Sequence, residues 1–193
     1  MKNRKRSTVI TIITMAIVAA AIVIGFIGLQ RRMSSKANNS SERDEEITKL
    51  ISADFENDYP PTAREVLYYY SRFLKCYYND DLTDEELTKL ATNNQKLFDE
   101  ELIEKNPLDS YIASLKEEIK KNKADKTTLV NWTVQDASDA EKEKKGGYNF
   151  NNLKASYFLK TGNKFTKSYE KFYIREDENG RWKILFWEVT DKF

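Results

Sequence analysis

An uncharged run of 22 residues constrains this chain more than any other feature. It extends from residue 8 to residue 29 and reads TVITIITMAIVAAAIVIGFIGL. At about 1.5 Å per residue, a helix of that length covers about 33 Å, which is enough to cross the hydrocarbon core of a bilayer. We therefore predict a transmembrane helix over residues 8–29, preceded by a basic tail at residues 1–7.

A cleavable signal peptide is the main alternative, because Lys2, Arg4, Lys5 and Arg6 resemble the basic region that opens such a peptide. Its apolar region spans about 7 to 15 residues and leads to a small-x-small cleavage site. The run here is longer and ends in Gln30-Arg31-Arg32, which favours an uncleaved anchor. A lipoprotein is disfavoured, because the single cysteine lies far beyond the run.

The orientation of the anchor depends on basic residues that are nearly balanced across it. Four of them precede the run within six residues, and five follow it: Arg31, Arg32, Lys36, Arg43 and Lys49. The dense cluster beside the amino terminus favours a cytoplasmic N-terminus under the positive-inside rule. We expect a single-pass protein of the cell membrane, with its C-terminal domain outside the cytoplasm, a setting that a chain poor in cysteine suits.

The composition excludes several classes of chemistry. Removing the six basic residues up to Arg32 from the total of 32 leaves 26 against 31 acidic residues, a formal charge of −5 for the remainder. This charge argues against a nucleic-acid surface. The chain has no histidine, which excludes His-based triads and His-ligated metals. One cysteine excludes an internal disulfide, and the acidic groups lack a calcium-loop pattern, so we expect no metal and no cofactor.

The rest of the chain divides into a linker and one domain. Residues 30–57 form the linker, in which Met33–Arg43 is polar enough to be a flexible tether. Asp44–Phe55 has apolar residues at helical spacing and predicts a short helix that either continues the stalk or docks on the domain. Pro60-Pro61 ends it, and residues 58–193 form the domain.

Helices fill the first half of this domain. Thr62–Glu65 and Thr83–Glu86 each match a capping box, in which the threonine and glutamate side chains bond to each other's backbone amides. The first box starts a helix with an apolar stripe that reaches about Tyr78, and the second starts a shorter helix. A further helix follows Asn106-Pro107, capped by Asp109 or Ser110.

Strands fill the second half. Val130, Trp132 and Val134 alternate on one face of a predicted strand. We predict strands over residues 127–135, 150–161, 167–177 and 181–190, and a charged loop over residues 136–147. Asn179-Gly180 predicts a type I′ hairpin between the last two strands, because both residues of that turn need positive φ.

Helices followed by antiparallel strands indicate an α+β fold, with about three helices on one face of a curved sheet. Two segments carry a resemblance to a known family: the capped helix start Tyr59–Val66 with Tyr70-Ser71-Arg72, and the ending Gly180–Trp187. Together they resemble an uncharacterised family of small membrane-anchored bacterial proteins whose soluble domain is NTF2-like. The resemblance covers about residues 58–193 and implies a cone-shaped domain with a pocket between helices and sheet.

Two groups of side chains are candidates for function. Tyr70, Phe73 and Tyr77 lie on the apolar stripe of the first helix of the domain, and with Trp132 they either pack the core or line a pocket. The last strand is apolar on both faces, with Trp182, Ile184 and Phe186 on one and Leu185, Trp187 and Val189 on the other. Because one face of this strand meets the helices, we predict that the other face, with Leu185, Trp187 and Val189, forms an interface.

The sequence therefore predicts a non-enzymatic, single-pass protein that holds the lipid bilayer through residues 8–29 and presents an interaction domain outside the cytoplasm. A homodimer or a larger envelope complex would cover the exposed face of the sheet. A tethered binder of a small molecule or peptide is the alternative. A pocket enzyme is a third hypothesis, for which the sequence offers no matched catalytic pair.

Overall fold

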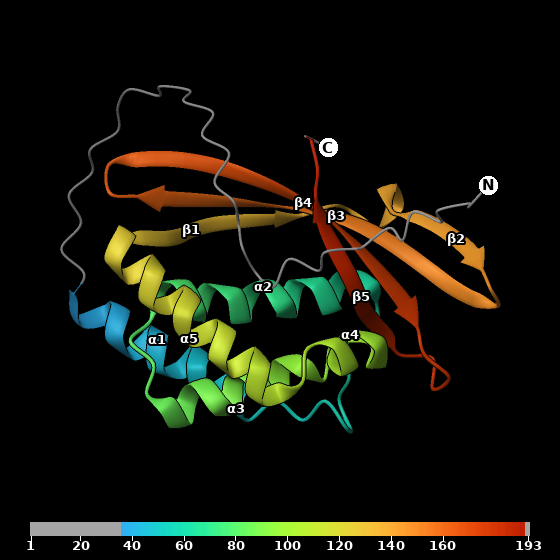
Figure 1. The fold of residues 1–193 in the computed structure, drawn as a ribbon, viewed down its shortest axis with the longest axis horizontal. Helices are drawn as coiled ribbons and strands as arrows, with labels where there is room; N and C mark the ends of the chain where they lie inside the picture. Colours follow the sequence, from blue (N-terminus) through green and yellow to red (C-terminus); the bar gives the residue numbers. More distant parts are fainter. Residues whose placement is uncertain (1–35, 192–193) are drawn as a thin grey trace, which may run out of the picture.

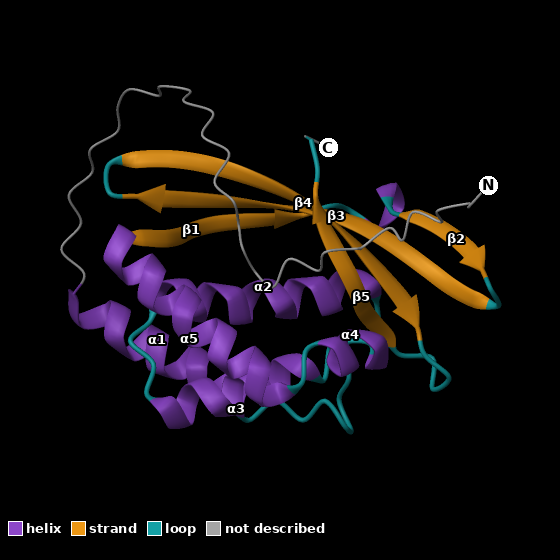
Figure 2. Ribbon diagram, in the orientation of Figure 1, coloured by secondary structure: helices purple, strands orange, loops and turns teal. Residues whose placement is uncertain are grey.

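The chain folds into two layers, with helices on one face of a curved antiparallel sheet (Figure 1). The structure, a computed structural model, describes residues 36–191, with side chains from residue 43 onwards. Five α-helices lie below a five-stranded sheet, and no described α-helix covers its other face (Figure 2). The predicted α+β class, with helices against a curved antiparallel sheet, is confirmed.

The predicted transmembrane helix at residues 8–29 lies outside the described residues. Within residues 36–191, no helix combines the length and the apolar character that crossing a bilayer requires. The prediction of a membrane anchor therefore rests on the sequence.

Helix α1, Lys36–Ile51, docks on the domain. Ile47 and Leu50 are buried in the core, and the helix packs against α3. Arg72 donates hydrogen bonds to both carboxylate oxygens of Glu46, at 2.6 and 3.1 Å, and so fixes α1 to the next helix. The predicted short helix therefore docks on the domain, which is one of the two alternatives stated for it. Helix α1 also includes residues 36–43, which belong to the segment predicted to be a flexible tether.

The other helices follow the predicted order. They are α2 Ala63–Asn79, α3 Asp84–Gln95, α4 Glu100–Lys105 and α5 Leu108–Asp125. The capping box at Thr83 and Glu86 is complete. At α2, Thr62 accepts from the Glu65 amide as predicted, but the Glu65 carboxylate accepts from the Thr62 hydroxyl and leaves the cap amide unbonded.

The predicted cap of α5 is wrong. The helix starts at Leu108 directly after Pro107, and neither Asp109 nor Ser110 caps it. Proline fits this position because its fixed φ suits a helix start, where an amide donor is not needed. The α5 helix ends at Asp125, followed by Lys126 in the left-handed conformation at φ 54°.

The sheet has two long central strands. Its members are β1 Thr127–Val134, β2 Glu141–Lys145, β3 Tyr148–Thr161, β4 Lys164–Glu176 and β5 Trp182–Val189. The order is β1-β3-β4-β5, all antiparallel, and β2 pairs with the part of β3 that lies beyond β1. The concave face of the sheet covers the helix layer, which lies below it in the view of Figure 1.

Strand β2 corrects the prediction of a charged loop over residues 136–147, and it makes the sheet five-stranded instead of four-stranded. Gly146 and Gly147 have φ of 61° and 89°, the pattern of a two-residue hairpin turn with positive φ at both positions. The five residues of β2 are all exposed. Because no face of this strand is buried, its sequence carries no apolar row that would have revealed it.

The hairpin between β4 and β5 is confirmed, but the predicted turn type is wrong. Gly180 has a positive φ of 74°, whereas Asn179 does not, so this is not a type I′ turn. The Asp177 carboxylate accepts hydrogen bonds from the amides of Asn179 and Arg181, at 2.9 and 2.8 Å. These side-chain bonds close a longer turn that needs only one left-handed residue.

A β-bulge in β1 changes which residues face the core. The register with β3 skips Val130, which is 46% exposed, while Leu129 is 1% exposed and pairs with Leu159. The predicted row of Val130, Trp132 and Val134 is therefore wrong at its first member. An extra residue in one strand reverses the faces on its two sides, which strict alternation cannot anticipate.

A second bulge does the same in β5. Ile184 pairs with Ile174 and Phe186 with Tyr173, so Leu185 has no partner across the ladder. The predicted division of this strand into two alternating rows is broken at that point, because Ile184 and Trp187 both face the helices.

Candidate functional site

The four residues predicted to line a pocket do not gather in one place. Tyr70, Phe73 and Tyr77 are buried in the helix layer. Trp132 is half-buried and lies elsewhere, against the exposed Tyr68 ring at 5.9 Å. Tyr70, Phe73 and Tyr77 are therefore interior residues, and Trp132 lies apart from them.

An aromatic cluster surrounds Tyr70 between α2 and the centre of the sheet. Its ring centroid lies 5.4 Å from that of Phe172, 5.6 Å from Trp187 and 6.2 Å from Phe98. Phe172 and Trp187 also stack on each other at 5.8 Å. The space between α2 and the centre of the sheet is thus packed with aromatic rings that touch one another.

A buried carboxyl group, Glu170, lies one pleat along β4 from this cluster. It shares the concave face with Phe172, since residues two apart on a strand point the same way. Its partners on the neighbouring strands are the small residues Ala155 and Val189. Glu170 is 4% exposed, and its side chain makes no hydrogen bond or ion pair with any other described residue. Burial, reinforced by the charge of Glu118, raises the pKa of Glu170 to about 8.

Three tyrosines, Tyr157, Tyr70 and Tyr78, lie near enough to this carboxyl group for its charge to raise the pKa of their phenols. The Tyr157 hydroxyl on β3 lies 3.2 Å from the Ser71 hydroxyl of α2, and both residues are buried. Burial is the main cause that raises the pKa of Tyr157 and of Tyr70, and the charge of Glu170 raises both further. Both phenols therefore stay neutral at any physiological pH.

A second carboxyl group approaches from α5. Glu118 accepts a hydrogen bond from the Tyr78 hydroxyl at 2.9 Å. Burial raises the pKa of Glu118 to about 7, and the bond from Tyr78 opposes that rise. We call Glu170, Glu118, Tyr157 and Tyr70 the interior acid cluster. It contains two carboxyl groups and two phenols from four different elements, and no described basic residue neutralises Glu170.

The interior acid cluster can hold a proton, but its composition does not match a metal centre. No group of three or more acidic or cysteine side chains comes together among the described residues. Calcium and magnesium prefer six or more oxygen ligands, which two carboxyl groups do not provide. The expectation of no metal stays a prediction.

The residues predicted to form an interface also separate. Trp187 turns inward to Tyr70, while Leu185 is half-buried at the bulge. Val189 is 54% exposed beside Glu170, near the end of β5. These three residues therefore do not form one surface.

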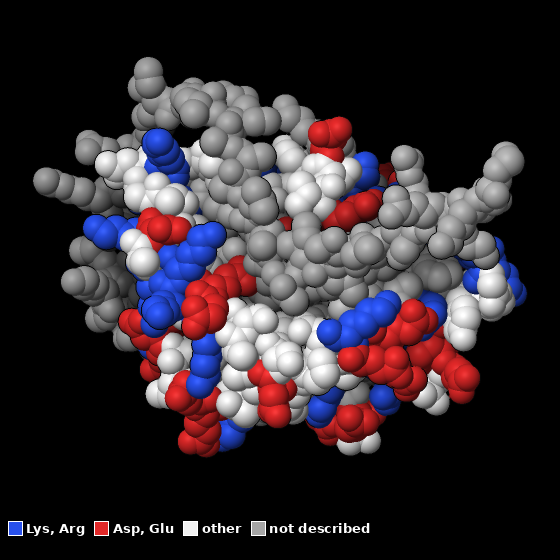
Figure 3. All heavy atoms as spheres, in the orientation of Figure 1, with Lys and Arg blue, Asp and Glu red and all other residues white. Residues whose placement is uncertain are grey.

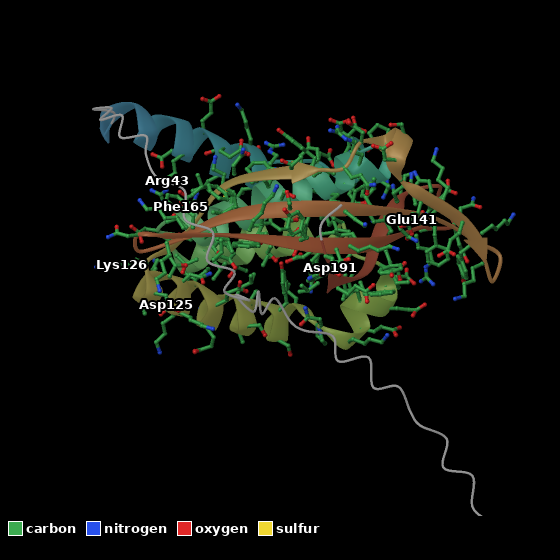
Figure 4. All side chains as sticks on the ribbon, turned by 90° about the horizontal axis from the view of Figure 1, so that it is seen from above. Arg43, Asp125, Lys126, Glu141, Phe165 and Asp191 are labelled. Atoms are coloured by element: carbon green, nitrogen blue, oxygen red, sulfur yellow. The ribbon has the colours of Figure 1, made fainter. Side chains whose placement is uncertain are left out.

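The outer face of the sheet presents a different set of aromatic residues, paired in stacks. Phe158 and Phe165 stack at 5.3 Å with an interplanar angle of 9°, and both are exposed. Tyr173 and Phe186 stack at 4.2 Å. Figure 4 looks down on the sheet, with Phe165 near one end and Glu141 toward the other. Together these four residues form what we call the outer aromatic face.

Basic side chains accompany these rings. The Nζ of Lys160 lies 5.8 Å from the Phe165 ring centroid, and that of Lys171 lies 5.2 Å from the Tyr173 ring. Lys171 is also paired with Glu141 at 2.6 Å. Lys160 and Lys167 have no carboxylate partner among the described residues. On the face of the molecule drawn in Figure 3, by contrast, basic and acidic side chains are interspersed.

The prediction from sequence missed Glu170 and the Phe158–Phe165 stack. A signal for Glu170 was present, because it shares the alternate row of Phe172 and Ile174 and so occupies a core position of its strand. The Phe158–Phe165 stack depends on the β3–β4 register, which residue types alone do not fix.

The chain matches the model of a protein family. A family model described as a domain of unknown function, DUF6715, matches residues 1–187. None of the curated proteins matches the chain.

Proposed function

Because this match covers nearly the whole chain, the chain belongs to the DUF6715 family, and from that premise we propose that it is a single-pass membrane protein whose NTF2-like domain binds a partner protein outside the cytoplasm, without catalysis. The expectation of an uncharacterised family is confirmed. The observation that carries the proposal is the outer aromatic face on the side of the sheet away from the helices.

The membrane part of the proposal is supported by the sequence of residues 8–29. The run has no charge over 22 residues and is flanked by basic residues on both sides. Helix α1 is docked on the domain by the Arg72–Glu46 pair, so few residues separate the predicted anchor from the folded part. The domain would then be held close to the bilayer.

The binding part of the proposal is supported by the chemistry of the outer aromatic face. Exposed aromatic rings are enriched at protein interfaces, because each buries a large area with little loss of side-chain freedom. Phe165 is 48% exposed and stacked flat on Phe158, so the pair is preorganised. Lys160 and Lys167 on the same face favour a partner with an acidic surface.

Photo-crosslinking tests this surface. A photoreactive amino acid at Phe165, in the full-length chain in its native membrane, should give a discrete adduct with an acidic partner protein. Tyr68 is a matched control, because it is an aromatic residue of the same 48% exposure on the helix side. Charge reversal by Lys160→Glu and Lys167→Glu should reduce the adduct at least severalfold. Equal adducts from both positions, or an adduct of twice the chain mass, would contradict the proposal.

Protease treatment of intact cells tests the topology. We expect added protease to remove the C-terminal domain and leave a membrane-embedded fragment that contains residues 8–29. A chain with an epitope tag at its N-terminus provides the control, since that tag should stay protected until the cells are opened. Protection of the whole domain in intact cells would show that the domain lies in the cytoplasm, contrary to the predicted topology.

A further inference from the structure

Helix α1 determines which end of the domain lies nearest the predicted anchor. The anchor ends at residue 29, and α1 begins at Lys36. Six residues, 30–35, separate them, so the connection from residue 29 to residue 36 spans at most about 25 Å. The sheet is longer, because β3 has 14 residues and runs for about 45 Å. One end of the domain is thus held near the bilayer, while the other can lie well away from it.

The end that is held near the bilayer also contains two chain connections. Figure 1 shows the start of α1, the turn between β3 and β4 and the junction of α5 with β1 at the same end of the molecule, and Figure 4 places Lys126 there. The Gly162 amide donates a hydrogen bond to the Lys126 carbonyl at 3.2 Å, which joins the turn to the junction. We call the surface formed by residues 126–127 and 161–164 the proximal end.

The proximal end is basic. Lys126 and Lys164 are exposed, and neither forms an ion pair with any described residue. No acidic residue occurs in residues 126–135 or 153–169, which form β1 and the parts of β3 and β4 next to this end. The connection to the anchor adds three basic residues and no acidic one: Arg31, Arg32 and Lys36.

The acidic residues near the proximal end do not cancel this charge. Those that follow α2 each have a basic partner: Asp80 with Arg43 at 3.2 Å, Asp81 with Lys123 at 2.8 Å, Asp84 with Lys116 at 2.8 Å and Glu85 with Lys89 at 2.6 Å. Asp125 is exposed beside Lys126 and offsets one charge. Lys164 and the basic residues of the connection leave this end positive.

We propose that the proximal end rests on anionic phospholipid headgroups of the bilayer that anchors the chain, with Lys126 and Lys164 against the lipid phosphates. The inference rests on the membrane anchor of the proposed function. Clustered lysines are attracted to anionic headgroups, and the attraction fades within a Debye length. The strands then rise from the bilayer, and the outer aromatic face, which lies on the side of the sheet away from α1, stays open to a partner protein.

Fluorescence quenching by lipids with a spin-labelled headgroup tests this contact. The full-length chain with Cys76→Ala carries one fluorophore, either at Asn163→Cys in the β3–β4 turn or at Lys144→Cys in β2, which pairs with the far end of β3. In nanodiscs rich in phosphatidylglycerol, the label in the turn should be quenched at least threefold more than the label in β2, because only the turn touches the headgroups.

Charge reversal identifies the cause. Lys126→Glu with Lys164→Glu should lower the quenching in the turn to the level found in nanodiscs of phosphatidylcholine, which has no net charge. Sodium chloride at about 0.5 M should do the same, since salt screens exposed charges. Lys142→Glu with Lys145→Glu is the matched control, because it changes the net charge equally on exposed residues of β2 and should leave the quenching unchanged.

Three outcomes would overturn the proposal. The first is equal quenching of the two labels in phosphatidylglycerol. The second is the same quenching in the turn in both lipids, and the third is the same quenching in both charge-reversal variants. A chain that does not stay in the nanodiscs would overturn the anchor as well. Crosslinking at Phe165 is measured separately and does not depend on lipid charge, so the proposed function and the lipid contact can fail independently.

Discussion

Replacing Glu170 with glutamine is expected to raise the free energy of unfolding at pH 9 by up to about 5 kcal/mol and to leave it nearly unchanged at pH 4. The pKa of Glu170 is raised from 4.5 to about 8 in the folded state. Between these values the folded chain holds a proton that the unfolded chain has lost, so stability falls as pH rises through this range. Each pKa unit corresponds to about 1.4 kcal/mol. Glutamine does not ionise, so the variant lacks the loss of stability that ionisation of the buried carboxyl group causes at high pH.

Urea unfolding followed by tryptophan fluorescence, at pH 4, 7 and 9 on the full-length chain in detergent, measures this effect. The difference between wild type and variant should grow steadily with pH. Glu178→Gln serves as the control and should show no pH-dependent difference. If Glu170→Gln instead destabilised the chain equally at all three pH values, Glu170 would have to be ionised and paired in the folded state.

Asp99→Ala is expected to lower the free energy of unfolding by about 3 kcal/mol. Arg175 donates to both Asp99 carboxylate oxygens, at 2.9 and 2.6 Å, and the Asp99 side chain is 4% exposed. The same carboxylate accepts from the Glu101 amide at the start of α4. The substitution removes a bidentate charge pair and a helix cap together, and it leaves a half-buried guanidinium without its main partner.

Glu101→Ala is the matched control, because Glu101 contacts the same guanidinium at 2.8 Å from an exposed position. Exposed ion pairs contribute about 0 to 1 kcal/mol, so this variant should stay close to wild type. A double-mutant cycle of Asp99→Ala with Arg175→Ala then isolates the pair. Similar losses from Asp99→Ala and Glu101→Ala would show that burial does not distinguish the two contacts.

The fold class was predictable because helix stripes and strand alternation are local signals. The apolar stripe of α2 and the cap at Thr83 appear where the sequence placed them. The faces of β1 and β5 were not predictable, since one extra residue at Val130 and one at Leu185 reverse the alternation. A bulge depends on pairing with the neighbouring strand, which a single strand does not encode.

The residues of the candidate sites were likewise predictable only where the signal is local in the sequence. Tyr70 and Tyr77 were predicted as interior residues from their helical spacing, and they are buried. Glu170 was missed because a charged residue in a strand is normally assigned to solvent, although its row marks a core position. The Phe158–Phe165 stack needs residues from two strands in one register, and only the folded sheet brings them together.

The short segment before α4 limits how this domain can assemble. The Asp99 amide donates a hydrogen bond to the Ile184 carbonyl, and the Ile184 amide donates one to the Leu97 carbonyl, each at 2.9 Å. Phe98, which lies between them, forms a parallel bridge with Ile184. The Tyr59 hydroxyl bonds to the Trp182 carbonyl on the same border. An incoming chain therefore finds no free ladder along this half of β5, and strand addition or fibre-like stacking is blocked there. The part of β5 around Ile184 is therefore not available for sheet extension, while the broad face of the sheet and its other edges remain open to association.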